Sequence, residues 1–121
     1  MNHYKKNVSL DERIRNSSVV INKYYPEKIP VIIQKSERDK QLPNLEKNKY
    51  LIPSSMTYSS LLIYLRNILT KKLPASTALF LNTESGHMLC CNDPLYKVYS
   101  DHSDKDDNFL YLFYCTENTF G

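Results

Sequence analysis

The residue with the most specific chemistry is Gly121, the last of the 121 residues. The sequence has only two glycines, where average usage of about 7% would give roughly eight. Because glycine has no Cβ, its carboxyl group can enter a narrow enzyme channel. There it can be adenylated, passed to a cysteine as a thioester and attacked by an amine. Residues 116–121 are therefore predicted to be a flexible conjugation tail, although a glycine can end any chain.

Other chemistry has weaker support. The remaining candidates are the histidines and cysteines, namely His3, His87, His102, Cys90, Cys91 and Cys115. The histidines fall in different segments, and the cysteines form no CxxC pair. The segment 104–108 (DKDDN) resembles the start of a calcium loop but lacks its glycine, and position twelve would be Cys115. We expect no catalytic residue, no metal site, no cofactor and no enzymatic activity.

Composition favours one domain in a reducing, cytoplasmic setting. No apolar run approaches the roughly 20 residues needed to span a bilayer, so membrane attachment would need an added group. The net charge of +3 is uneven, with 11 Lys+Arg against 6 Asp+Glu in residues 1–60. This basic half favours acidic partners, but no aromatic and basic signature of nucleic-acid binding accompanies it.

Two helices are expected near the start and the middle of the chain. Ser9, with Glu12 three residues later, forms a capping box for a helix that should end near Tyr24, before Pro26. Its apolar stripe would be Leu10, Ile14 and Ile21, with Ser17 between them. A short helical turn is also expected within 2–8. The strongest helical spacing follows Thr57, with a core face of Leu61, Leu62, Leu65, Ile68 and Leu69, and should end by about Leu73 before Pro74.

Four strands are expected, at 29–35, 49–53, 78–81 and 109–115. The first two can close as a hairpin, and the last is apolar throughout, which indicates burial on both faces in the middle of a sheet. Asp93 is predicted to cap a short helix with Pro94 at its first position. This order is typical of the α+β ubiquitin-like β-grasp fold, in which the last strand lies parallel to the first. We expect a single domain with an N-terminal helical extension (1–25), a β-grasp core (26–115) and the tail.

Several motifs then indicate a family. Residues 23–32 (KYYPEKIPVI) resemble the KYPDRIPVI signature of the autophagy-related ubiquitin-like modifiers, which include the GABA-receptor-associated protein and the microtubule-associated light chain modifiers. Residues 49–53 (KYLIP) are similar to that family's KYLVP, and 109–111 with 117–121 to its FLY and ENTFG. Lys28 and Ile68 stand where relatives usually have arginine.

The resemblance implies a conjugation pathway. A cysteine protease would trim any residues after Gly121 and later remove the lipid. Activating and conjugating enzymes would join the glycine to phosphatidylethanolamine, placing the protein on the autophagosome membrane. Receptors with an aromatic-x-x-aliphatic motif would then be recruited by strand addition to the edge of 49–52.

The resemblance also implies the docking residues. The aromatic pocket would consist of Ile21, Pro30, Ile32, Lys49, Leu51 and Phe109. The aliphatic pocket would consist of Tyr50, Ile52, Pro53, Met56, Leu61 and Tyr64. A basic rim would be formed by Lys28, Lys47, Lys49 and Arg66. Because strand residues alternate between faces, we interpret Leu51 and Ile32 as pocket residues, whereas Leu62 and Leu65 are interpreted as core.

Two other interpretations stay open. One is a ubiquitin-like module that binds receptors or microtubules and is never conjugated. The other is the sister autophagy modifier that is linked to a protein lysine, which lacks the N-terminal helix and the KYxxP motif.

Overall fold

The computed structural model describes residues 2–69, 77–90 and 92–116. In chain order the elements are α1 (His3–Asn7), α2 (Leu10–Tyr24), β1 (Lys28–Lys35), β2 (Lys49–Pro53), α3 (Tyr58–Leu69), β3 (Phe80–Thr83), α4 (Leu95–His102) and β4 (Leu110–Cys115). Within these ranges, no helix combines the length and apolar character that crossing a membrane requires.

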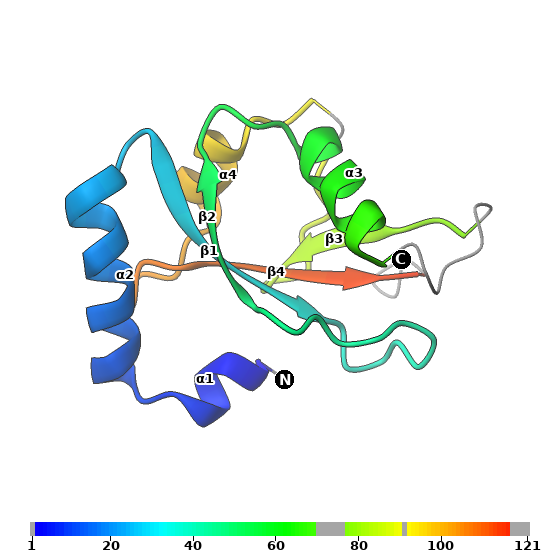
Figure 1. Cartoon of the computed structure of the whole chain (residues 1–121), viewed down its shortest axis with the longest axis horizontal. Coiled ribbons are helices and arrows are strands. Elements are labelled where there is room, and N and C mark those ends of the chain that lie inside the picture. Colours follow the sequence, from blue (N-terminus) through cyan, green and yellow to red (C-terminus); the bar gives the residue numbers. More distant parts are fainter. Residues whose placement is uncertain (1, 70–76, 91, 117–121) are drawn as a thin grey trace.

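The strands form one mixed sheet in the order β2-β1-β4-β3 (Figure 1). β1 and β2 pair antiparallel as a hairpin, with Pro30 opposite Leu51. β1 and β4 pair parallel, with Ile32 opposite Tyr111, and β4 lies inside the sheet as its apolar sequence predicts. The expected hairpin and the parallel central pair of the β-grasp fold are therefore confirmed.

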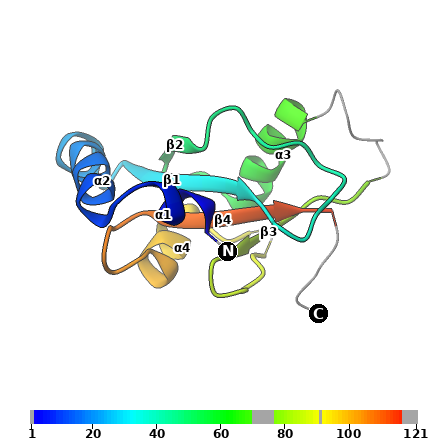
Figure 2. The ribbon, with the colours of Figure 1, turned by 90° about the horizontal axis from the view of Figure 1, so that it is seen from below.

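Helices cover both faces of the sheet (Figures 1 and 2). Val31 and Ile33 of β1 belong to the main core, which includes buried residues of α3 and α4. Ile32, between them in sequence, faces the other side and packs with Tyr4 of α1 in a smaller cluster that also holds Phe109 and Tyr111. Alternation along a strand thus divides the core into two layers, and the N-terminal helices cover the second layer.

The helix signals are largely confirmed. The Ser9 hydroxyl accepts the amide of Glu12 at the start of α2, and the Thr57 hydroxyl accepts the amide of Ser60 at the start of α3. α2 ends at Tyr24, as Pro26 predicts. The predicted end of the second helix near Leu73 lies outside the described residues.

Two local predictions are wrong. The third strand begins at Phe80 rather than at residue 78, because Phe80 already pairs with Cys115, the last residue of β4. Asp93 does not cap α4, because its carboxylate turns back to accept the amide of Cys90 at 2.9 Å. Pro94 has an extended backbone and takes the cap position itself, without a side-chain hydrogen bond.

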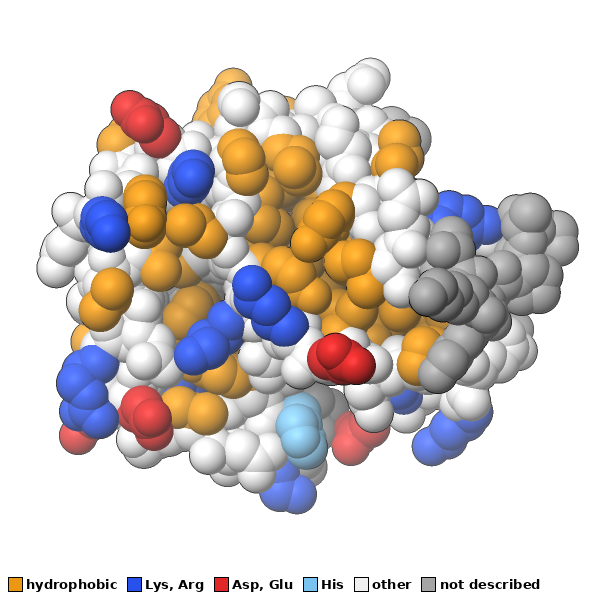
Figure 3. Space-filling model, viewed as in Figure 1, with side chains coloured by type: hydrophobic (Ala, Val, Ile, Leu, Met, Phe, Trp, Pro, Cys, Tyr) orange, Lys and Arg blue, Asp and Glu red, His pale blue; other side chains and the backbone are white. Residues whose placement is uncertain are grey.

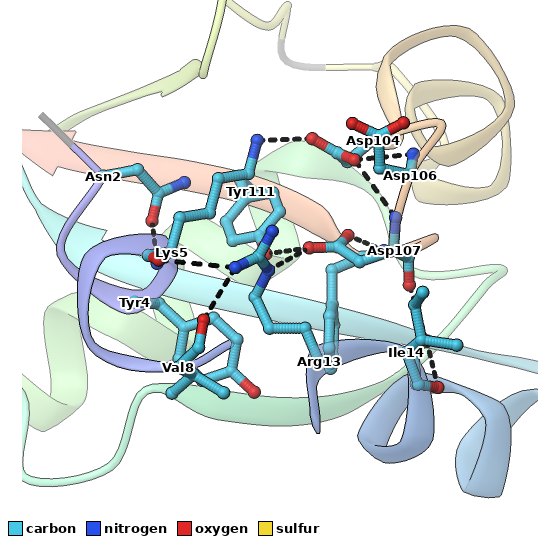
Figure 4. Close-up of polar contacts among 12 residues, drawn as sticks. Asn2, Tyr4, Lys5, Val8, Arg13, Ile14, Asp104, Asp106, Asp107 and Tyr111 are labelled. Atoms are coloured by element: carbon cyan, nitrogen blue, oxygen red, sulfur yellow. Dashed lines mark hydrogen bonds and ion pairs between the residues drawn. The ribbon is translucent and has the colours of Figure 1, made fainter. Parts of the chain in front are cut away.

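A buried carboxylate, that of Asp107, attaches α2 to the loop before β4 (Figure 4). Its Oδ2 accepts Arg13 Nε at 2.9 Å and also the Tyr111 hydroxyl, while its Oδ1 accepts the Phe109 amide. The Ser17 hydroxyl donates to the Asp107 carbonyl. Burial raises the pKa of the Tyr111 phenol well above its usual range, and the Asp107 carboxylate raises it further, so the phenol remains a hydrogen-bond donor.

The expected apolar stripe of α2 is therefore wrong in part. Leu10 is 42% exposed and Ile14 is 37% exposed, whereas Ser17 is completely buried. The Arg13 guanidinium reaches the carbonyl oxygens of Lys5 and Val8 as well, joining α1 to the same network. α2 is thus held at its centre by polar contacts rather than by a leucine and isoleucine face.

The loop that follows β1 is connected to the end of β4. The Ser36 amide donates to the Tyr114 carbonyl, and the Tyr114 hydroxyl donates to the Pro43 carbonyl at 2.6 Å. Asp39, which is 6% exposed, accepts the amides of Gln41 and Leu42 through Oδ1. These bonds fix the loop against the last strand.

Replacing Arg13 by leucine should strongly destabilise the fold. The Asp107 side chain has no exposed surface, so the variant leaves a buried carboxylate without its counter-charge. Such losses cost about 3 kcal/mol or more, and urea denaturation would measure the change. Arg15→Leu, at an exposed position of the same helix, is the matched control and should change the stability by less than about 0.5 kcal/mol. Equal losses in the two variants would contradict this account.

Asp39 should make the stability depend on pH. Burial alone would raise the pKa of its carboxyl group, but hydrogen bonds from Thr116, Leu42 and Gln41 outweigh burial and lower the pKa from 3.8 to about 2. Because the folded pKa lies below the unfolded one, the stabilisation is complete above about pH 4 and is lost as the pH falls through about 2.

This stabilisation amounts to roughly 2 kcal/mol, at about 1.4 kcal/mol per pKa unit. The difference in unfolding free energy between the wild type and Asp39→Asn should therefore shrink by about that amount between pH 6 and pH 2. Urea denaturation across this range measures it, and a difference independent of pH would contradict the assignment.

Candidate docking surface at the edge of β2

β2 lies at the edge of the sheet, and no strand in the described part of the chain pairs with its outer side. Its residues alternate between the faces. Tyr50 and Ile52 point to the side of α3 and pack with the main core. Lys49 and Leu51 point to the side of α2. The free edge is thus bordered by different side chains on each face of the sheet.

On the α2 side, a pocket of about 320 Å³ opens between α2 and β2. Its lining includes four of the six residues expected in an aromatic pocket, which are Pro30, Lys49, Leu51 and Phe109. Leu51 is 37% exposed at this pocket, whereas Phe109 is buried. The structure therefore places these four side chains around one cavity that is large enough for a ring.

The other two expected residues do not line this pocket. Ile32 has no exposed surface and belongs to the same buried cluster as Tyr4 of α1, so it lies in the core beneath this face. Ile21 is half-buried near the end of α2 and is not part of the lining. Asn16, Val19 and Val20 of α2 take their place. Their i, i+3 and i+4 spacing is the signal that would have found them.

The expected aliphatic pocket lies on the α3 side and is partly core. Ile52 and Leu61 are buried in the main cluster, so only their neighbours offer a surface. Tyr50 and Met56 are partly buried against that cluster, and Tyr64 is 46% exposed. The rings of Tyr50 and Tyr64 meet edge to face at 6.3 Å, and burial together with Tyr64 raises the pKa of the Tyr50 phenol. Pro53 is exposed where β2 ends.

A further pocket of about 420 Å³ was not predicted. It lies beyond Tyr50, between the β1–β2 loop and the end of α3, and its lining includes Leu45, Lys47, Ile68 and Leu69. Figure 3 shows hydrophobic side chains gathered over α3 and β2 on this side of the molecule, with basic side chains beside them. Ile68 was expected on the core face of α3, but this is wrong, because it is 44% exposed and extends this apolar surface.

Only part of the expected basic rim is brought together. Lys47 and Lys49 both line the pocket on the α2 side, and the Lys47 ammonium lies 5.5 Å from the centre of the Tyr50 ring. Lys28 is opposite Pro53, at the other end of β2. Arg66 lies on α3 and donates to the Thr77 carbonyl at 2.6 Å. Positive charge is therefore concentrated beside the aromatic-pocket residues.

The predicted tail is described only at its first residue. Thr116 is held against the domain, because its amide and its hydroxyl both donate to Asp39 Oδ2, at 2.7 Å and 2.6 Å. Gly121 and the four residues before it lie outside the described residues.

Comparisons with known proteins show the family of this chain. The family model described as "Autophagy protein Atg8 ubiquitin like" matches residues 12–121. Autophagy-related protein 8D of rice is 37% identical over 118 residues, which cover 98% of this chain and 96% of that protein. The human microtubule-associated protein 1 light chain 3 gamma is 31% identical over 109 residues, which cover 89% and 72%.

Solved structures give the same result. The crystal structure of Trypanosoma brucei ATG8 superposes with a TM-score of 0.85 at 29% identity, covering 100% of this chain and 99% of that one. The family match over residues 12–121, the similarity of the relatives across most of the chain and the shared fold lead to one assignment. The chain belongs to the Atg8 family of autophagy-related ubiquitin-like proteins.

Proposed function

We propose that this protein is conjugated through the carboxyl group of Gly121 to phosphatidylethanolamine, and that on the autophagosome membrane it recruits receptors with aromatic-x-x-aliphatic motifs. The observation that supports the docking role is the free edge of β2 with an apolar surface on each side. Membership of the Atg8 family, with a match that includes Gly121, supports the conjugation role.

Conjugation is a sequence of acyl transfers in which the protein is the substrate rather than the catalyst. The Gly121 carboxylate attacks the α-phosphate of ATP and pyrophosphate leaves. A cysteine thiolate of the activating enzyme displaces AMP to form a thioester, which passes to the conjugating enzyme. The lipid amine then attacks that second thioester, the cysteine thiolate of the conjugating enzyme leaves, and an amide forms. A two-chain lipid anchors a protein stably, whereas one acyl chain binds membranes only marginally.

A receptor strand beside β2 fits both surfaces. Side chains three places apart on a strand point to opposite faces and are separated by about 10 Å. The aromatic side chain would enter the pocket on the α2 side, near Lys49 and Leu51, and the aliphatic one would lie on the α3 side, near Ile52 and Met56. Because the first pocket is at the start of β2 and the second near its end, the receptor strand would run parallel to β2. Acidic residues before the aromatic one would then meet Lys47 and Lys49.

Conjugation predicts a product that depends on Gly121. With ATP, the activating and conjugating enzymes, and liposomes containing phosphatidylethanolamine, the wild type should shift in gel mobility and float with the liposomes. Gly121→Ala should give no shift, because a Cβ obstructs the narrow enzyme channel. Omitting ATP is the control, and mass spectrometry identifies the added lipid.

The outcome also decides between the other interpretations. No product from the wild type, with enzymes that are active on their own modifier, would refute conjugation and favour a binding module. A product on a protein lysine instead of the lipid would indicate the sister modifier.

Docking predicts a specific loss of affinity. Leu51→Ala should weaken binding of an aromatic-x-x-aliphatic peptide by about tenfold, equivalent to roughly 1.4 kcal/mol, because the aromatic side chain loses a wall of its pocket. Isothermal titration measures the dissociation constant. Leu10→Ala is the matched control, since Leu10 is similarly exposed but lies outside the pocket lining. Equal affinity of the Leu51 variant and the wild type would refute docking at this edge.

A further inference from the structure

The two oxygens of the Asp39 carboxylate accept hydrogen bonds from different segments. One bonds to the loop that contains Asp39, and the other bonds to Thr116, just after β4. Oδ1 accepts the Gln41 and Leu42 amides, both at 2.9 Å, which fixes the orientation of the carboxylate. Oδ2 accepts the amide and the hydroxyl of Thr116. The Lys35 ammonium donates to the Asp39 carbonyl at 2.6 Å and holds the same turn from β1. The carboxylate is therefore preorganised before it meets Thr116.

These contacts occur where the pairing of β4 with its neighbouring strands ends. The β1–β4 ladder ends with Lys35 opposite Tyr114, and the β3–β4 ladder ends with Phe80 opposite Cys115. Thr116 thus lies beyond the last paired residue on both sides of β4, directly after Cys115 on the β3 side. Asp39 Oδ2 accepts the Thr116 amide where no strand of the described sheet does so. Without it, the backbone of Thr116 would be free to fray.

We propose that Asp39 is a positioning residue for conjugation, which holds Thr116 so that the five residues up to Gly121 start from a fixed point on the domain. This inference rests on the proposed conjugation of Gly121. Two donors of one residue bind a single oxygen, so both the backbone and the side-chain rotamer of Thr116 are set.

Fixing Thr116 matters because Gly121 is only five residues beyond it. Five residues span at most roughly 17 Å, so the volume that the Gly121 carboxyl group can search is small. An enzyme that docks on the folded domain meets that carboxyl group at an effective concentration set by where the tail begins. If Thr116 were loose, the Gly121 carboxylate would search a larger volume. A smaller fraction of the enzyme-bound protein would then have that carboxylate correctly placed for attack on ATP.

The test measures thioester formation by the activating enzyme under steady-state conditions. Asp39→Asn presents an NH₂ group or a weaker acceptor to the two Thr116 donors, and Thr116→Val removes the hydroxyl donor. Both variants should lower kcat three- to tenfold and change KM for the protein less than twofold, because the docking surface is intact. Thr116→Ser keeps both donors and should retain the wild-type kcat.

Tyr114→Phe is the matched control. It removes the hydrogen bond from the Tyr114 hydroxyl to the Pro43 carbonyl, so it loosens the same loop from the same strand without touching Thr116. Its kcat should be unchanged. A purely structural role for Asp39 would lower the melting temperature in all three loosened variants without separating kcat from KM.

Each outcome is decisive. Wild-type kcat in both Asp39→Asn and Thr116→Val would overturn the positioning role while leaving the proposed conjugation intact. A kcat for Tyr114→Phe as low as theirs would also overturn it, since general loosening would then suffice. If the wild type forms no thioester, the proposed conjugation and this inference fail together.

Discussion

The parallel pairing of β1 with β4 determines where the other parts of this protein lie. Both strands are buried on their two faces, and residues 31–35 of β1 match residues 110–114 of β4 in register. At the start of this pair, Pro30 and Phe109 come together in the wall of the pocket. At its far end, the loop after Lys35 reaches Thr116. The pocket beside β2 and Thr116 are therefore positioned by opposite ends of one buried ladder.

The second face of the sheet is covered unevenly, and this creates the pocket. Tyr4 of α1 packs over Ile32 and Tyr111, so that part of the face is closed. Arg13 and Ser17 attach α2 to the Asp107 loop, away from the edge strand. The space between α2 and β2 is consequently not filled, and Leu51 remains partly exposed there. A polar attachment of α2 is thus what leaves an apolar cavity open beside it.

Local signals in the sequence were sufficient for most of the fold. Pro26, Ser9 and Thr57 mark helix ends through backbone constraints that act within a few residues, and the apolar β4 segment indicates its central place. Long-range contacts were not accessible in this way. Whether Ile32 is covered depends on Tyr4, 28 residues away, and the buried state of Ser17 depends on Asp107. The start of β3 likewise depends on where β4 ends, which its own sequence does not encode.

The candidate site was predictable to a similar extent. Motif positions identified Pro30, Lys49, Leu51 and Phe109, which do surround one pocket, whereas the contribution of α2 depends on how that helix is attached.

The β2 strand also limits a hazard that every open sheet has, which is polymerisation through its unpaired edge. β2 is only five residues long, begins with Lys49 and ends with Pro53, and both short length and such residues discourage stacking of identical chains. An edge of this kind disfavours pairing with the same edge of a second copy of the protein, while it remains accessible to a short strand from another protein.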